Sequence, residues 1–374
     1  GHFAAQCLRF SDFVLALNEG MDALFQRRQT QKKNEAGRKL IAQQYAGVTG
    51  ILKQVGESMR SGTEILPAQE KELRTYAEAF GRVRTVAAWK DRRGRLHLEL
   101  TGECVQRILR SQEGFTSGLG ALMHVTLTKP ETQYDSGGMR LMFREQEPYY
   151  ITVGIGTRTR EGQQISGDCV RYFTTEEGMA CVILSDGMGS GEQAREESES
   201  TVRMAERFLR AGISAADCVR TIGPALKLRT QGKKFVTLDI STIDLFTGEA
   251  VSVKCGAAPS FVRAADGDDS VRVRRILSST LPAGLEEAGD MDVTQFRMGS
   301  QDALVLLSDG IVDADGSNAG WVEELLADSV KLSARELAAR LVLEGSARGA
   351  PDDMSAVVVY LGKRTQRETQ EAGG

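Results

Sequence analysis

The chain has 374 residues, of which 41% are hydrophobic and 26% are charged, and its formal net charge at pH 7 is −4. This length suffices for two or three compact units, and the composition is typical of a soluble globular protein. The small net charge gives no electrostatic support for binding nucleic acid. The sequence has no run of eighteen apolar residues that would predict a membrane span.

Six cysteines are scattered without a Cys-x-x-Cys pair, and the chain has three histidines. This pattern argues against a zinc site and favours a reducing compartment. No histidine follows His124, so we exclude histidine-dependent triads and histidine-ligated metallophosphatases from the rest of the chain.

Residues 1–62 are predicted to form a long helical segment. Apolar residues recur there at helical spacing on both sides of a basic stretch at 26–39. An exposed apolar seam favours packing on another part of the protein or on a second copy, so we interpret the segment as regulatory or dimerising. The basic stretch is interpreted as a solvated helix face, with an anionic membrane surface as the alternative.

Residues 63–147 are predicted to form a small α+β regulatory domain without a catalytic signal. Strands over 83–89 and 96–100 flank a turn at 91–94, and a helix over 103–112 and a strand near 139–143 follow. The spacing of Cys104 and Arg110 matches that of cysteine-dependent phosphatases. We reject that reading, because the stretch lacks the glycines of a phosphate loop and has a helical pattern.

Residues 148–362 alternate between strands, glycine-rich turns and three amphipathic helices, which indicates an α+β domain with helices packed on sheet faces. A hairpin is expected around 236–255, with its turn at Thr247 and Gly248. Helices are expected over 192–210, over 214–229 and from Ser333, which forms a capping box with Glu336. Residues 363–374 are predicted to be a disordered tail.

Two apolar strands of this domain, 179–185 and 303–307, are both followed by an aspartate and a glycine within a Ser-Asp-Gly sequence. Two such strands side by side would place Asp186 and Asp309 within reach of one ion. We expect the glycines after them to adopt a positive φ and to let their carbonyls approach a ligand.

Further acidic residues stand at Asp168 and at Asp352 and Asp353. A cluster of carboxylate and carbonyl oxygens suits hard octahedral cations, Mn²⁺ or Mg²⁺, rather than zinc. Two such ions sharing one carboxylate can hold a hydroxide at neutral pH and neutralise a phosphoryl group during in-line attack.

These motifs, in this order, resemble those of the metal-dependent protein phosphatase (PPM) family over roughly residues 150–361. The resemblance implies a two-sheet β-sandwich flanked by helices, with two metal ions at one edge. The segments that carry it are 154–168, 185–191, 238–241, 256–261, 281–284, 308–311 and 352–355.

By the same resemblance, each acidic position receives a role. Asp186 would bridge the two ions, the carbonyl of Gly187 would bind the second, and Asp309 and Asp352 would bind the first. Asp168 would act in catalysis by holding metal-bound water. Asp353 is included among the metal residues, although many relatives carry asparagine at its position.

Two features of eukaryotic relatives have no clear counterpart in this chain. Met188 stands where they carry a histidine thought to protonate the leaving group. Their phosphate-binding arginine has no match either, and Arg158 and Arg160 are the candidates for that role.

The resemblance further implies hydrolysis of phosphoserine or phosphothreonine on a protein by a two-metal-bridged water. The implied substrate is a phosphorylated anti-anti-sigma factor of the STAS type, in the control of a sporulation sigma factor. It also implies a homodimer or higher self-assembly, and a cytoplasmic location as the soluble part of a membrane-anchored bacterial protein.

Other readings of the sequence stay open at this point. One is a non-catalytic module that binds a phosphoprotein or self-assembles as a scaffold, and another is a PPM phosphatase with a different bacterial substrate. The stretch from Asp313 to Glu324 approximates a calcium loop, but Asn318 replaces its glycine, so we interpret it as a surface loop.

Overall fold

The computed structural model describes residues 64–91, 93–135, 138–187, 189, 191–230, 235–265, 271–285, 291–314, 316, 319–329, 331–350 and 352–364. The predicted helical segment of residues 1–62 and the tail from residue 365 lie outside these residues. Among the helices of the described part, none is long and apolar enough to cross a membrane.

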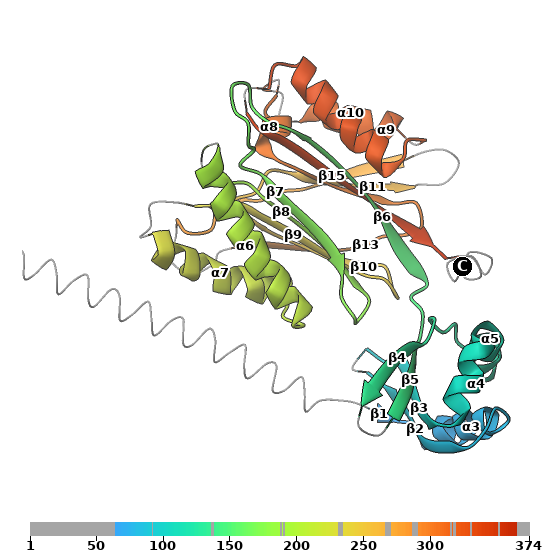
Figure 1. The fold of residues 1–374 in the computed structure, drawn as a ribbon. Coiled ribbons are helices and arrows are strands. Elements are labelled where there is room, and N and C mark those ends of the chain that lie inside the picture. Colours follow the sequence, from blue (N-terminus) through green and yellow to red (C-terminus); the bar gives the residue numbers. More distant parts are fainter. Residues whose placement is uncertain are drawn as a thin grey trace, which may run out of the picture.

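The first part of the described chain is a five-stranded antiparallel sheet with helices on one face (Figure 1). Its strand order is β1-β2-β3-β5-β4. Leu98, Leu100 and Leu141 point from the sheet into the core beneath the helices and are fully buried. The elements are β1 (Glu64–Ile65), α3 (Pro67–Glu78), β2 (Val83–Lys90), β3 (Leu96–Gly102), α4 (Cys104–Arg110), α5 (Gln112–Met123), β4 (Glu131–Asp135) and β5 (Gly138–Arg144).

The predicted strand pair and turn of this part are confirmed, and the single helix expected over 103–112 is wrong in its extent. The helix is interrupted at Ser111, which separates α4 from a second helix, α5. Cys104 lies in α4 with its side chain fully buried, so the segment is helix and core rather than a phosphate-binding loop.

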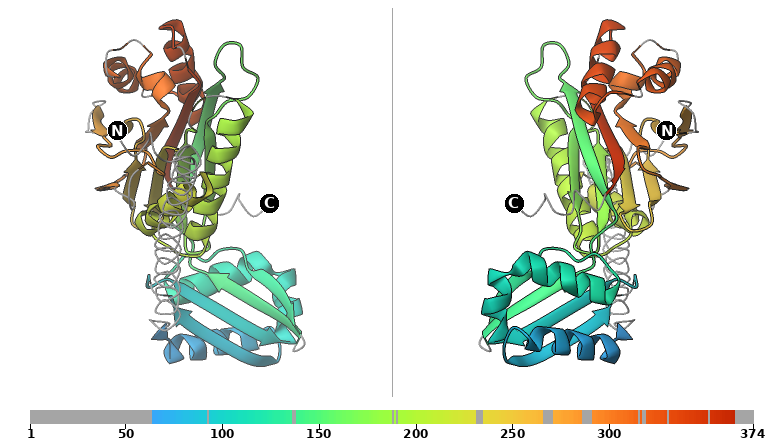
Figure 2. Two further views of the ribbon diagram at one scale, coloured as in Figure 1. Left: turned by 90° about the vertical axis from the view of Figure 1, so that its left-hand side faces the viewer. Right: turned by 90° about the vertical axis from the view of Figure 1, so that its right-hand side faces the viewer.

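The rest of the described chain is a sandwich of two five-stranded sheets in which every neighbouring pair of strands is antiparallel (Figure 2). One sheet has the order β13 (Asp292–Arg297), β10 (Glu249–Cys255), β9 (Leu238–Asp244), β8 (Met179–Ser185) and β7 (Cys169–Thr174). The other has the order β12 (Val271–Ile276), β11 (Ser260–Ala265), β14 (Ala303–Leu307), β15 (Met354–Lys363) and β6 (Tyr149–Arg158).

Strand β8 shows why the chain forms layers. Val182 and Leu184 belong to the core between the two sheets, whereas Cys181 and Ile183 belong to the core beneath two helices. Successive side chains of a strand point to opposite faces, so an unbroken apolar run is buried on both sides. The helices on that sheet are α6 (Glu192–Arg210) and α7 (Ala215–Thr230), while α8 (Asp309–Val312), α9 (Gly320–Asp328) and α10 (Ala334–Ala347) lie on the other (Figure 1).

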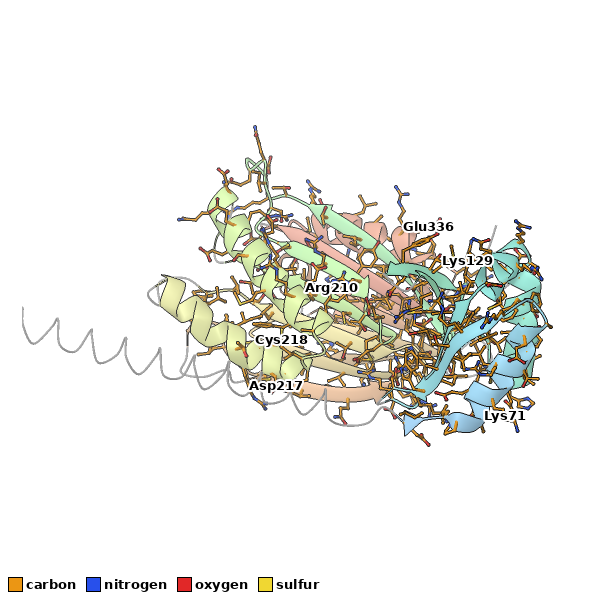
Figure 3. All side chains as sticks on the ribbon, turned by 60° about the horizontal axis from the view of Figure 1, so that its bottom comes forward. Lys71, Lys129, Arg210, Asp217, Cys218 and Glu336 are labelled. Carbon is orange, nitrogen blue, oxygen red and sulfur yellow. The ribbon has the colours of Figure 1, made fainter. Side chains whose placement is uncertain are left out.

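Local sequence signals account for several of these elements. The prediction for α6 is confirmed to the residue, the hairpin of β9 and β10 turns at Thr247 and Gly248 as expected, and Ser333 caps α10 with both hydrogen bonds of the capping box. Arg210 lies at the C-terminal end of α6 (Figure 3). Its guanidinium is 4.2 Å from the centre of the Phe173 ring. The two-sheet sandwich flanked by helices is therefore confirmed.

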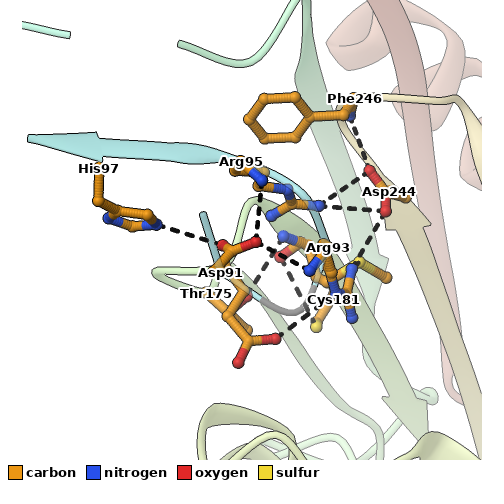
Figure 4. Close-up of polar contacts among 10 residues, drawn as sticks. Asp91, Arg93, Arg95, His97, Thr175, Cys181, Asp244 and Phe246 are labelled. Carbon is orange, nitrogen blue, oxygen red and sulfur yellow. Dashed lines mark hydrogen bonds and ion pairs between the residues drawn. The ribbon is translucent and has the colours of Figure 1, made fainter. Parts of the chain in front are cut away.

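The hairpin between β2 and β3 contacts the sandwich through two arginines (Figure 4). Arg93 and Arg95 both bind the carboxylate of Asp244 at the end of β9, at 3.1 and 3.2 Å. The Arg95 guanidinium also lies 4.0 Å from the centre of the Phe246 ring. This contact joins the first sheet to one end of strands β8 and β9, and Asp186 lies at the opposite end of β8.

Candidate metal centre

The two Ser-Asp-Gly motifs end strands of different sheets, so the expectation that these strands lie side by side is wrong. β8 pairs with β7 and β9, and β14 pairs with β11 and β15. Both strands nevertheless end at the same edge of the sandwich, where Asp186 and Asp309 line one pocket. The carboxylates thus meet across the space between the sheets.

The serine of each motif fixes its strand end to a neighbouring strand. The Ser185 hydroxyl donates to the carbonyl of Thr237 over 2.8 Å, and the Thr237 hydroxyl accepts from the backbone N–H of Asp186 over 3.1 Å. In the second motif the Ser308 hydroxyl accepts from the backbone N–H of Ser355 over 2.8 Å. Both aspartates therefore start from an anchored backbone.

The glycine of each motif is needed for space and not for a positive φ, which corrects the sequence-based expectation. Neither Gly187 nor Gly310 is among the described residues with a positive φ. A Cβ on Gly187 would lie 2.4 Å from the carbonyl oxygen of Ala194 in α6, and one on Gly310 would lie 2.1 Å from that of Asp353. Closely packed backbone thus excludes any side chain at these two positions.

Helix α6 holds the turn that carries Asp168. The Ser198 hydroxyl donates to the carbonyl of Gly167 over 2.6 Å, and the Arg195 guanidinium donates to the carbonyl of Asp168. The Asp168 side chain is only 4% exposed, and neither of its carboxylate oxygens has a hydrogen-bond partner. Burial removes water from this carboxylate, and the nearby hydroxyls of Ser308 and Ser355 offset only part of the cost of ionising it.

Electrostatics show that the carboxylates are close to one another. Burial raises the pKa of Asp168, and the nearby Asp309 and Asp353 raise it further, although the hydroxyls of Ser355 and Ser308 are near enough to oppose the shift. Burial is also the main reason why the pKa of Asp186 is raised, followed by repulsion from Asp168 and Asp309.

Asp309 and Asp352 complete the cluster. The Asp309 side chain reaches solvent, yet enclosure of its carboxylate raises its pKa, and repulsion from Asp352 adds to the shift. Asp352 also contributes to raising the pKa of Asp186. Four predicted metal residues, Asp168, Asp186, Asp309 and Asp352, therefore act on one another at a single edge of the sandwich.

Asp353 differs from these four in how its oxygens are used. One oxygen accepts from the backbone N–H of Arg160 over 2.7 Å, and the other accepts from that of Gly167 over 2.6 Å. The residue is 4% exposed. Asp353 therefore anchors both ends of the loop that leads to Asp168.

The two arginines considered for phosphate binding lie beside this edge. Arg158 ends β6 and is paired with Met354, and the backbone of Arg160 contacts Asp353. Both side chains are exposed. Met188, which replaces the histidine of eukaryotic relatives, lies outside the described residues.

Sequence reasoning missed two residues of this edge, Thr237 and Asp239. Thr237 anchors Asp186, and Asp239 lines the pocket together with Asp186 and Asp309. The signal for Asp239 was present, because this residue lies in segment 238–241, which carries part of the family resemblance, and it is an acidic residue buried within β9.

The donor set fits divalent cations that prefer oxygen ligands. Within the described part of the chain, no three acidic, histidine or cysteine side chains form a ready-made metal site. Repulsion from neighbouring carboxylates nevertheless raises the pKa of Asp168, Asp186 and Asp309, so positive charge at this edge would relieve that cost. Carboxylate oxygens without nitrogen or sulfur suit Mn²⁺ or Mg²⁺.

Comparisons with known proteins agree with this fold. Residues 176–361 match the family model described as stage II sporulation protein E. The chain is 26% identical over 348 residues to the protein of that name from Priestia megaterium, covering 89% of this chain and 58% of the relative. The corresponding Bacillus subtilis protein is 26% identical over 352 residues, covering 90% of this chain and 41% of the relative. The chain thus spans about half the length of these relatives.

A solved structure supports the architecture of both described parts. It contains the PP2C phosphatase domain and a fragment of the regulatory domain of the Bacillus subtilis protein SpoIIE, a cell fate determinant. The TM-score is 0.64 at 23% identity, and the alignment covers 90% of this chain and 99% of that structure. At this identity the match shows that the two share a fold.

Proposed function

Since residues 176–361 belong to the stage II sporulation protein E family, we propose that this chain is a metal-dependent protein phosphatase acting on phosphoserine or phosphothreonine. The observation that carries the proposal is the meeting of Asp168, Asp186, Asp309 and Asp352 at one edge of a PP2C-type sandwich. Carboxylates that repel one another in a partly buried site are costly without a cation, so their presence argues for a working metal centre.

Two divalent cations, Mn²⁺ or Mg²⁺, would activate water for in-line attack on phosphorus and neutralise the phosphoryl charge. Asp186 and Asp309 would hold them from opposite sheets, with the Gly187 carbonyl and Asp352 completing the oxygen set. Asp168 would accept hydrogen bonds from water, because both of its oxygens are without a donor. Asp353 would keep Asp168 in place through the loop that it anchors.

The proposed substrate is a phosphoserine of a STAS-type anti-anti-sigma factor, which would place the enzyme in the control of a sporulation sigma factor. The family to which residues 176–361 belong supports this assignment. We further propose that residues 63–147 are a regulatory domain, residues 148–362 the catalytic domain, and residues 1–62 a segment that dimerises. We also propose that this chain is the cytoplasmic part of a longer, membrane-anchored protein.

The direct test is phosphate release from a phosphoserine protein with Mn²⁺ or with a chelator, comparing the parent chain with Asp186→Asn. We expect release that needs both Mn²⁺ and Asp186. Asp328→Asn, an exposed aspartate at the end of α9, is the matched control and should keep the parental rate.

The outcome also separates the alternatives. No Mn²⁺-dependent release from any phosphoprotein, with the parent folded and Mn²⁺ bound, would favour a non-catalytic module that binds phosphoproteins or self-assembles. Release from a phosphoserine peptide but not from a phosphorylated STAS-type protein would keep the phosphatase and reject the proposed substrate.

A further inference from the structure

A charged pair is buried between the two sheets, and one of its members lines the pocket that Asp186 and Asp309 also line. Asp239 of β9 and Lys254 of β10 face each other in the strand register, and Ser260 of β11 reaches them from the other sheet. Asp239 is 1% exposed, and Lys254 and Ser260 are fully buried. The three side chains therefore join the sheets at the end of the sandwich that carries the carboxylates.

The hydrogen bonds use only one oxygen of Asp239. Oδ2 accepts from the Lys254 ammonium and from the Ser260 hydroxyl, and Lys254 also donates to Ser260 Oγ over 2.8 Å. Oδ1 of Asp239 is buried and has no partner. A carboxylate that is locked on one side and free on the other is an expensive arrangement in a protein interior.

Joining the sheets does not by itself explain these charges. Desolvation of a buried ion pair offsets most of its attraction, and an apolar pair of similar volume usually stabilises as well or better. The same layer already contains apolar neighbours, including Leu184 and Val262. A role for the free oxygen would account for a charged group at this place.

The position of Asp239 supplies such a role. Asp239 pairs with Leu184, two residues before Asp186, and follows Thr237, which anchors the Asp186 backbone. Asp239 also lines the pocket together with Asp186 and Asp309. Asp239 thus brings a carboxylate oxygen without a partner, Oδ1, to the lining that it shares with the two predicted metal residues.

We propose that Lys254 and Ser260 are positioning residues that hold Asp239 so that its Oδ1 accepts a hydrogen bond from the water shell of a divalent cation in this pocket. This inference rests on the proposed function and adds a residue outside the predicted ligand set. Groups that orient the shell around a metal typically change its affinity by about 10- to 100-fold when they are removed.

The test measures Mn²⁺ binding directly, by titration calorimetry on metal-stripped chain. The main variant is the double substitution Asp239→Leu with Lys254→Met, which removes both charges together and so leaves neither unpaired. We expect it to fold with a melting temperature close to that of the parent and to bind Mn²⁺ roughly 10-fold more weakly or worse. Ser252→Ala is the matched control, because its buried hydroxyl lies two residues from Lys254 and has no partner.

A second variant guards against misfolding of the first. Asp239→Asn keeps the shape of the side chain. Its amide oxygen would accept from Lys254, so its NH₂ group, a donor, would take the place of the acceptor Oδ1. We expect weaker Mn²⁺ binding here too, whereas Ser260→Ala, which keeps the ion pair, should show a smaller loss.

Mn²⁺ affinity equal to the parental value in the folded double variant and in Asp239→Asn would overturn the inference, and leave the pair as a link between sheets. That result would not touch the proposed function, which depends on phosphate release by the parent. No Mn²⁺ binding by the folded parent would overturn both.

Discussion

Replacing Asp353 tests whether this residue is a loop anchor or a metal ligand. Its two oxygens accept the backbone N–H groups of Arg160 and Gly167 at 2.7 and 2.6 Å, and its side chain is 4% exposed. Asp353→Ala removes the acceptor of both donors, at a cost of roughly 1–3 kcal/mol for the buried N–H of Gly167 and less for the part-buried N–H of Arg160. The variant should therefore lose about 1–4 kcal/mol in the free energy of unfolding, or show local opening of the loop.

Asp353→Asn should cost about half as much, because one amide oxygen can still accept one of the two N–H groups. Urea unfolding gives the free energies, and limited proteolysis reports opening of residues 159–166. Mn²⁺ titration then separates the two roles. If Asp353 is an anchor, Asp353→Asn should still bind Mn²⁺, whereas Asp353→Ala should bind it more weakly. Equal loss of Mn²⁺ binding in both variants without loss of stability would refute our reasoning and make Asp353 a direct ligand.

Three further predictions follow from the geometry. Gly187→Ala should lower the free energy of unfolding by about 1–3 kcal/mol and weaken Mn²⁺ binding, because its Cβ would lie 2.4 Å from the Ala194 carbonyl oxygen. Gly114→Ala is the control, since a Cβ there would meet nothing within 4 Å, and urea unfolding should show it to be neutral or stabilising. Asp244→Ala should lower the free energy of unfolding by roughly 3–5 kcal/mol, because it leaves the buried Arg95 without its ion pair. Glu177→Gln removes the exposed pair with Arg93 and should lower it by less than about 1 kcal/mol. Equal losses in the two variants would contradict the contact between Arg95 and Asp244. In metal-stripped chain, the pKa of Asp168 and of Asp186 is raised from 3.8 to about 6 and about 9, so the folded state binds more protons than the unfolded state above about pH 4, and the free energy of unfolding should fall as pH rises toward 9. Saturating Mn²⁺ should remove that slope, and a slope unchanged by Mn²⁺ would argue against a metal at these carboxylates.

Much of the local structure could be read from the sequence, because its causes are local. The apolar period of residues 192–210, the capping box of Ser333 and the turn residues of the β9–β10 hairpin depend on neighbours within a few positions, and each prediction is confirmed. The break at Ser111 was missed, because the helical pattern continues on both sides of it.

At the candidate site, the sequence predicted which residues take part but not how they are brought together. Repetition of Ser-Asp-Gly after two apolar strands pointed to Asp186 and Asp309, but nothing local says that the two strands belong to different sheets. The reason for the glycines also lay beyond local sequence, since the atoms that exclude a side chain at Gly187 and Gly310 come from Ala194 and Asp353.

The sequence by itself determined the α+β class, the positions of several elements and four acidic residues that meet at one edge, because strand periodicity and strand-end chemistry depend on neighbouring residues. Only the tertiary structure decided that Asp353 holds a loop and that Lys254, Asp239 and Ser260 meet between the sheets. Those contacts join residues that are up to 193 positions apart, and whether a buried carboxylate is paired or free depends on which distant donors packing brings to it.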